Sequence, residues 1–124
     1  MHNDTTERQP PASLEENLKK ATTELMILQL FSEREHYIGE LSAAIHAKSG
    51  GILSIVFPYA AIYRLQAGGY IQELPRRIAP DGRRRQYFAI TEQGLGYLQQ
   101  LRDIYQTFVK GVSQLLEEGI INNE

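Results

Sequence analysis

Five arginines fall within ten positions of this 124-residue chain, and they are its most chemically specific side chains: Arg76, Arg77, Arg83, Arg84 and Arg85. A guanidinium group keeps its charge at any physiological pH, and its planar fork can hold two phosphate oxygens. The cluster flanks the turn signal Pro80-Asp81-Gly82, which predicts a hairpin tipped with arginine. The commonest anionic partner of such a hairpin is nucleic acid. The alternative is a solvated edge hairpin that uses charge to prevent aggregation.

Charge is distributed unevenly along the chain, whose net charge is −2. Residues 70–91 carry five arginines against Glu73 and Asp81, a local charge of +3. Residues 1–69 carry −2 and residues 92–124 carry −3. Only the middle block attracts a polyanion, so we expect a local contact with nucleic acid rather than one spread over the surface.

The bulk composition predicts one cytoplasmic domain. A chain of 124 residues is of ordinary size for a single domain. It has no cysteine, and we see neither a secretory signal nor an apolar run long enough to span a membrane. We expect no disulfide and no cofactor.

Nothing in the sequence indicates catalysis or metal binding. The three histidines, His2, His36 and His46, lack the spacing of metal ligands, and we expect them at the surface or at its boundary. The chain has no phosphate-binding loop, no dinucleotide fingerprint and no nucleophile elbow. We therefore predict that it is not an enzyme.

Apolar residues at spacings of three and four predict a long first helix. Ser13 opens it in a capping box with Glu16, because each side chain satisfies an otherwise unpaired backbone amide. Residues 25–31 are apolar nearly all round, which places them in the core. Two further helices are expected over residues 38–47 and 57–67.

The rest of the chain predicts two strands and a long helix. The strands are expected over residues 70–77 and 84–90, and the last helix begins after Thr91, a good N-cap. Three helices, two strands and a long helix indicate a mainly α winged helix-turn-helix with a small β-hairpin. The expected segments are a disordered arm (1–12), a DNA-binding winged-helix domain (13–90), a dimerisation helix (91–119) and a tail (120–124).

The third helix is the expected reader of DNA, because this element of a helix-turn-helix lies in the major groove. Its outward residues are Tyr59, Tyr63, Arg64 and Gln66, and we add Ser54 just before it to the predicted DNA-binding residues. Glutamine can pair with adenine, and arginine with guanine or phosphate. The alternative is that the tyrosines belong to the core or to an interface.

The last helix carries a heptad seam with spacings of 3, 4, 3, 4 and 3: Leu98, Leu101, Tyr105, Phe108, Val112 and Leu115. Such a seam predicts helix pairing. A helix of this length cannot bury all of its apolar surface on a small headpiece, so a symmetric dimer is the simplest expectation. The alternative is packing on the first helix of the same chain, and both arrangements can hold together.

Two segments resemble the PadR family of bacterial transcriptional regulators, and the resemblance covers about residues 20–118. One segment runs from Pro58 to Ile71 as PYAAIYRLQAGGYI, and the other runs from Gly82 to Gly94 as GRRRQYFAITEQG. Shorter matches are TELMIL at residues 23–28 and YIGEL at residues 37–41.

The resemblance implies a dimeric winged-helix repressor of the branch with a single C-terminal helix. It implies that Tyr59 and Arg64 lie on the recognition helix and that residues 83–85 form the wing. In some members flat ligands bind between aromatic residues of the last helix, which implies an effector pocket for a small aromatic molecule at Tyr105 and Phe108.

The segment before the third helix departs from the family pattern, which usually has polar residues there. This chain has the apolar run Ile55-Val56-Phe57-Pro58, which is poorly suited to reading bases. A second hypothesis follows, in which the winged helix is a protein-interaction module that uses this apolar run and the arginine-rich wing.

Overall fold

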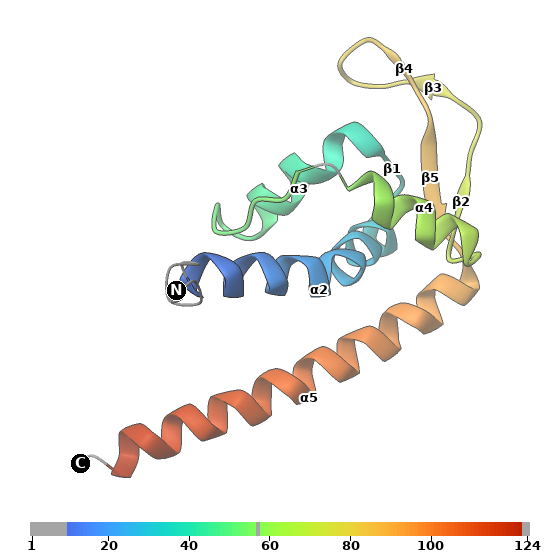
Figure 1. Ribbon diagram of the computed structural model, residues 1–124. Helices are drawn as coiled ribbons and strands as arrows, with labels where there is room; N and C mark the ends of the chain where they lie inside the picture. Colours follow the sequence, from blue (N-terminus) through green and yellow to red (C-terminus); the bar gives the residue numbers. More distant parts are fainter. Residues whose placement is uncertain (1–9, 57, 123–124) are drawn as a thin grey trace, which may run out of the picture.

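The computed structural model describes residues 10–56 and 58–122 (Figure 1). Helices dominate, and a small antiparallel sheet carries the wing. In chain order the elements are α2 (Pro10–Glu33), β1 (His36–Tyr37), the 3-10 helix η1 (Ile38–Glu40), α3 (Leu41–Lys48), α4 (Tyr59–Ala67), β2 (Ile71–Glu73), β3 (Arg77–Ile78), β4 (Arg84–Arg85), β5 (Tyr87–Ile90) and α5 (Glu92–Asn122). The mainly α winged-helix fold predicted from the sequence is confirmed.

The sheet joins the helices to the wing. Strand β5 lies between β1 and β2, so that Phe88 faces both His36 and Glu73. Beyond it the short pair β3–β4 forms the end of the hairpin, which extends away from the helices (Figure 1). The wing is thus a continuation of the core strand β5, and the core sets its direction.

The core gathers around α2, as the apolar run at residues 25–31 predicts. Helix α2 packs on α3, α4, α5 and β5. The inward residues expected on the third helix, Ala61, Ile62 and Leu65, are all buried. Within the described residues the buried hydrophobic cluster consists of Ile27, Leu28, Leu30, Phe31, Leu41, Ile45, Ile55, Ala61, Ile62, Leu65, Ile71, Phe88 and Leu98.

The bounds of the helices differ from prediction. The predicted helix over residues 38–47 is divided into η1 and α3, and α4 begins at Tyr59 rather than at residue 57. The other differences are at the chain ends. Helix α2 begins at Pro10 rather than at Ser13, because proline is well suited to the first turn of a helix. Ser13 therefore lies inside the helix, and residues 10–12 of the predicted disordered arm are helical. The remainder of that arm lies outside the described residues. Helix α5 runs to Asn122, so the predicted tail begins three residues too early.

The two predicted strands are each divided into two short ones. Pro75 has no backbone N–H and falls in the gap between β2 and β3, where a ladder hydrogen bond would need one. On the other strand, the side-chain amide of Gln86 donates to the carbonyl of Leu74 across the gap. Strand β1 was not predicted, because two residues within a polar segment carry no readable alternation.

Gly94 allows α5 to start directly against the sheet. Thr91 caps the helix as predicted, since the Gly94 amide donates to its Oγ1 at 2.9 Å. A Cβ atom at Gly94 would overlap the backbone carbonyl of Tyr70. We expect Gly94→Ala to lower the free energy of unfolding by about 1–3 kcal/mol, the usual cost of overpacking, as measured by urea denaturation.

Gly96 provides the matched control for Gly94→Ala, because it lies on the same helix with no atom near its missing Cβ. Gly96→Ala is expected to raise the free energy of unfolding by about 0.5–1 kcal/mol, through reduced backbone entropy of the unfolded chain. Equal effects of the two substitutions would contradict a steric role for Gly94.

Candidate nucleic-acid interface

Helix α4 presents an exposed face made largely of tyrosine and alanine. Tyr59 is 59% exposed and Tyr63 is 75% exposed, and the two lie one turn apart on the side opposite the buried residues. Ala60 and Ala67 are also exposed. Helix α4 packs against β2 and lies near the base of the wing (Figure 1). The predicted outward residues are therefore on the surface.

The two polar candidates of α4 are bonded within the chain. Arg64 Nε lies 2.5 Å from Glu24 Oε2 of α2, and Gln66 Nε2 donates to Glu73 Oε2 of β2 at 3.1 Å. These partners draw both side chains to the flanks of the helix. The sequence contained no signal for either contact, because the partner of Arg64 is 40 residues away along the chain.

Two of the five wing arginines are held against the protein surface. Arg77 Nη1 lies 2.7 Å from Glu35 Oε1, and its guanidinium carbon is 3.6 Å from the centre of the Tyr87 ring. Arg85 Nη2 lies 2.5 Å from Asp81 Oδ2, and its guanidinium carbon is 5.0 Å from the Tyr37 ring centre. Sequence reasoning missed the two tyrosines.

The two tyrosines join these contacts into one structure at the base of the wing. Their rings pack edge to face with centres 5.4 Å apart, a favourable aromatic geometry. Tyr37 belongs to β1 and Tyr87 to β5, and the two residues are paired in the sheet. Arg77 lies over Tyr87, the two tyrosine rings pack on each other, and Arg85 lies over Tyr37. Together these three contacts fix the wing to the core.

The wing leaves three arginines available. Among the described residues, Arg76, Arg83 and Arg84 are exposed and have no ion-pair partner. Asp81 shapes the turn, because its Oδ1 accepts the Arg83 backbone N–H at 3.0 Å. The hydrogen bond from Arg85, with help from the Arg83 amide, holds the pKa of Asp81 below its usual value. The wing can therefore bind phosphate through three unpaired guanidinium groups.

His36 is buried, so its predicted position at the surface was wrong. It is 2% exposed, its Nδ1 lies 2.9 Å from Glu40 Oε2 in a hydrogen bond, and its ring packs on Phe31. Burial lowers the pKa of His36, with Glu40 acting in the opposite direction. Its pairing with Phe88 across β1 and β5 explains the burial, while His46 is exposed as expected.

The apolar segment before α4 is turned mostly inward. Ile55 and Pro58 are buried, Val56 is exposed, and Phe57 lies outside the described residues. Ser54, a predicted DNA-binding residue, is exposed with its hydroxyl 3.4 Å from His46 Nδ1. Because two of the three described apolar residues are already buried, this segment offers little surface for the protein-interaction hypothesis.

Helix α5 carries most of the predicted seam on an open surface. Leu98 is 4% exposed and belongs to the core of its own chain, which removes it from the predicted dimer interface. Leu101 is partly buried against the same core. Beyond them Tyr105, Phe108, Val112 and Leu115 are exposed, and Phe108 and Leu115 reach 65% and 72%. The start of the predicted seam therefore packs within the chain, and the rest of it is exposed in the single chain.

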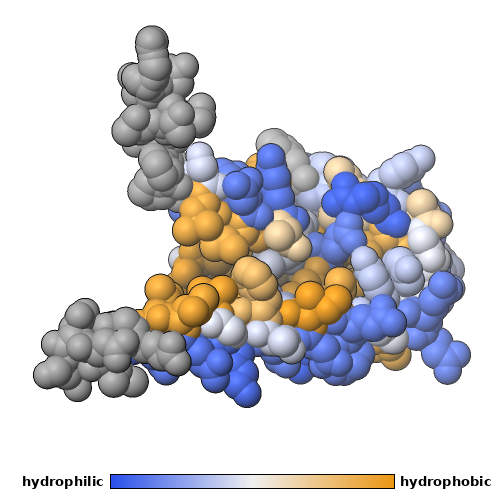
Figure 2. All heavy atoms as spheres, turned by 60° about the horizontal axis from the view of Figure 1, so that its bottom comes forward, coloured by the Kyte–Doolittle hydropathy of each residue, from blue (hydrophilic) through white to orange (hydrophobic). Residues whose placement is uncertain are grey.

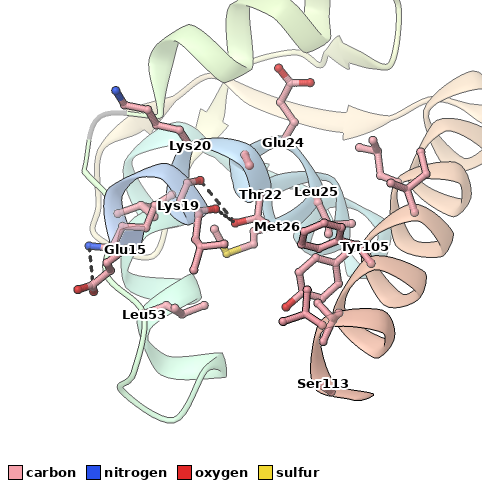
Figure 3. Close-up of a pocket in the computed structure, with 18 of the residues that line it drawn as sticks. Glu15, Lys19, Lys20, Thr22, Glu24, Leu25, Met26, Leu53, Tyr105 and Ser113 are labelled. Atoms are coloured by element: carbon pink, nitrogen blue, oxygen red, sulfur yellow. Dashed lines mark hydrogen bonds and ion pairs between the residues drawn. The ribbon is translucent and has the colours of Figure 1, made fainter. Parts of the chain in front are cut away.

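An apolar groove separates α5 from α2. Figure 2 shows hydrophobic side chains on both sides of a hollow, and the groove has a volume of about 850 Å³. Leu18, Leu25 and Met26 line it from α2, and Tyr105 and Phe108 line it from α5. Tyr105 points into the groove toward α2 (Figure 3). The two predicted effector-pocket residues thus lie in one cavity.

Within residues 10–56 and 58–122, no cluster of histidine, aspartate and glutamate can hold a metal ion. Over those same ranges, no helix has the length and apolar character needed to cross a membrane.

Comparisons with known proteins give structural relatives only. No family model and no curated protein sequence matches the chain. A PadR-like transcriptional regulator from Bacillus cereus is 26% identical, with a TM-score of 0.68 over 81% of this chain and 96% of that one. A transcriptional regulator from Clostridium thermocellum is 26% identical, with a TM-score of 0.69 over 79% and 96%.

A PadR family regulator from Eggerthella lenta shares the fold over 91% of this chain and 97% of its own, with a TM-score of 0.72 at 22% identity. A match of that length takes in the winged helix and much of α5. The fold and these likenesses support the PadR-family resemblance predicted from the sequence: the chain is similar to PadR-like transcriptional regulators over most of its length.

Proposed function

We propose that the chain is a homodimeric transcriptional repressor that binds double-stranded DNA and is released from it by a small aromatic effector. Helix α4 enters the major groove, the wing tip contacts the flanking phosphates, and the outer part of α5 joins two copies. The long helices set the distance between the two headpieces, and hence a half-site spacing near one turn of DNA.

One observation carries the DNA-binding part of this proposal. Arg76, Arg83 and Arg84 are exposed on a chain of net charge −2, and no carboxylate in the described residues pairs with them. Unpaired cations on an exposed hairpin suit phosphate. The similarity to transcriptional regulators supports the same conclusion.

The dimer is supported by the exposed apolar side chains of α5. From Ile104 to Leu116 this helix exposes large hydrophobic residues at almost every turn, and an exposed stripe of that size marks an interaction surface. A two-fold axis places the same stripe of a second copy against it. Ile104, Val109 and Leu116 widen the seam.

The groove between α2 and α5 is the proposed effector site. Its volume of about 850 Å³ suits a small organic molecule, and Tyr105 and Phe108 offer rings for stacking. A ligand seated there changes how α5 packs, and therefore the spacing of the headpieces. An effector with higher affinity for the DNA-free spacing releases the repressor.

The proposal is tested by fluorescence anisotropy on duplex DNA from the region upstream of the gene. Affinity is expected to fall steeply between about 50 and 200 mM salt, because phosphate neutralisation releases counterions. Transcription from the same DNA should fall when the protein is added. Affinity that does not respond to salt, or transcription that rises, would contradict the proposal.

The contact between Arg77 and Glu35 can be tested with the variant Glu35→Gln. The direction of the change in DNA affinity distinguishes a structural role of Arg77 from a phosphate-binding role. If Arg77 holds the wing in place, Glu35→Gln loosens the wing and lowers DNA affinity by about two- to fivefold, the range expected for an exposed ion pair. If Arg77 binds phosphate, removal of the competing carboxylate raises affinity. We expect the decrease, measured by anisotropy.

The control for this variant is the salt dependence of binding. Glu35→Gln removes no cation, so the slope of log affinity against log salt should stay unchanged. Glu33→Gln removes a nearby carboxylate that pairs instead with Lys48, and it should leave DNA affinity as it was. A matching decrease in both variants would mean that the loss does not depend on the Arg77 contact, and a matching increase would point to net charge as the cause.

A further inference from the structure

The outward face of α4 has an unusual chemistry for a helix that reads DNA. Its centre is formed by Tyr59, Ala60, Tyr63 and Ala67, all exposed. These residues lie opposite Ala61, Ile62 and Leu65, which anchor the helix in the core. The residues best placed to meet a base edge therefore present methyl groups and aromatic rings.

The side chains that would read bases by paired hydrogen bonds lie at the edges of this face. Arg64 is directed to Glu24 of α2, and Gln66 is directed to Glu73 of β2. Each contact occupies one nitrogen of its side chain and competes with pairing to guanine or adenine. Bidentate hydrogen bonding from α4 is thus opposed by the fold itself.

Only one group in the major groove is apolar. The C5 methyl group of thymine projects there, and alanine or an aromatic ring makes favourable contact with it. Adenine, guanine and cytosine offer hydrogen-bonding groups, for which the centre of this face has only tyrosine hydroxyls. Resting on the proposed DNA binding, we propose that α4 selects its operator by contact with thymine methyl groups.

The wing supplies affinity without sequence information. Its exposed arginines, Arg76, Arg83 and Arg84, suit phosphate oxygens, which are the same in every sequence. Helix α4 packs on β2, from which the wing continues, so phosphate contacts fix the depth and register of α4. Selectivity then follows from the shape and methyl groups of the groove floor.

Replacing thymine by deoxyuridine tests this proposal, because it removes the methyl group and keeps every hydrogen-bonding group. A pool of duplexes with about 20 random base pairs, enough for two half-sites, is selected for binding. The selected duplex is then made with deoxyuridine at each thymine in turn. Affinity is expected to fall about fourfold for each contacted methyl group removed.

Two variants link the effect to the helix face. Tyr63→Ala, at a residue 75% exposed, should bring the ratio of thymine to deoxyuridine affinity close to one at its base. Gln66→Ala lies on the same helix and should leave that ratio unchanged. A ratio retained in Tyr63→Ala and also in Tyr59→Ala would assign the methyl contact to another element and overturn the proposal.

The possible results separate this inference from the proposed function. Salt-dependent binding with equal affinity for thymine and deoxyuridine duplexes overturns the methyl readout and leaves DNA binding intact. A selected sequence without thymine in its half-sites would also overturn the methyl readout and leave DNA binding intact. Failure to retain any duplex contradicts both conclusions and favours a protein partner for this face.

Discussion

Phe108→Asp is expected to convert the dimer into a monomer without unfolding the protomer. The side chain is 65% exposed in the single chain, so replacing it removes little of the chain's own packing. In a two-fold dimer the substitution occurs twice in one apolar interface. Burying unpaired carboxylates costs several kcal/mol, which corresponds to a dissociation constant raised about a thousandfold.

The mass in solution measures this directly. The wild type should sediment at about twice the 14.1 kDa of one chain, and the variant at the mass of one chain, both at micromolar concentration. DNA affinity should fall about a hundredfold or more, because a monomer engages one half-site and does not benefit from the effective concentration of the second. Circular dichroism confirms that the variant remains helical.

Gln114→Asp is the matched control for this experiment. It adds the same charge to the same helix, at an exposed residue about 120° around the axis from Phe108. This variant should remain dimeric and bind DNA normally. A wild-type protein with the mass of one chain, or a dimeric Phe108→Asp variant, would contradict the proposed interface.

The second large effect is expected at the wing tip. Replacing Arg76, Arg83 and Arg84 with alanine should lower DNA affinity on the order of a thousandfold, because charge-assisted hydrogen bonds each contribute about 1.5–3 kcal/mol. The slope of log affinity against log salt should flatten by about 0.9 for every phosphate that is no longer neutralised. Stability should change little, since all three side chains are exposed.

Two further variants show whether the loss of DNA affinity in the triple variant comes from local phosphate contacts or from the lower net charge. Arg102→Ala removes an exposed cation from α5, away from the wing, and should preserve both the affinity and the salt slope. Arg85→Gln breaks the ion pair with Asp81, and should lower affinity while the slope stays close to that of wild type. A triple variant with an unchanged slope would mean that the tip does not meet phosphate.

Several features of the fold and of the site followed from the sequence because they depend on near neighbours. The N-cap at Thr91 needs only an amide three residues away. The inward residues Ala61, Ile62 and Leu65 follow from helical periodicity, and the arginine-rich hairpin from its turn signal. Each of these local patterns reports geometry within one element.

The contacts that make some arginines paired and leave others available could not be predicted from the sequence. Arg77 meets Glu35 across 42 positions and Arg64 meets Glu24 across 40, and no local pattern relates such pairs. The burial of His36 and Leu98 likewise arises where separate elements meet. The division of the long helix into a core part and an exposed part has the same origin.

The amino-acid sequence by itself determined the order of the main helices and of the hairpin, the winged-helix class, the family resemblance and the clustering of positive charge at a hairpin. Only the tertiary structure decided that two wing arginines fix the hairpin while three remain available, and that α4 presents an apolar surface between its bonded polar flanks. Local backbone preferences act over a few residues, whereas the availability of a side chain depends on which distant groups the folded chain brings beside it.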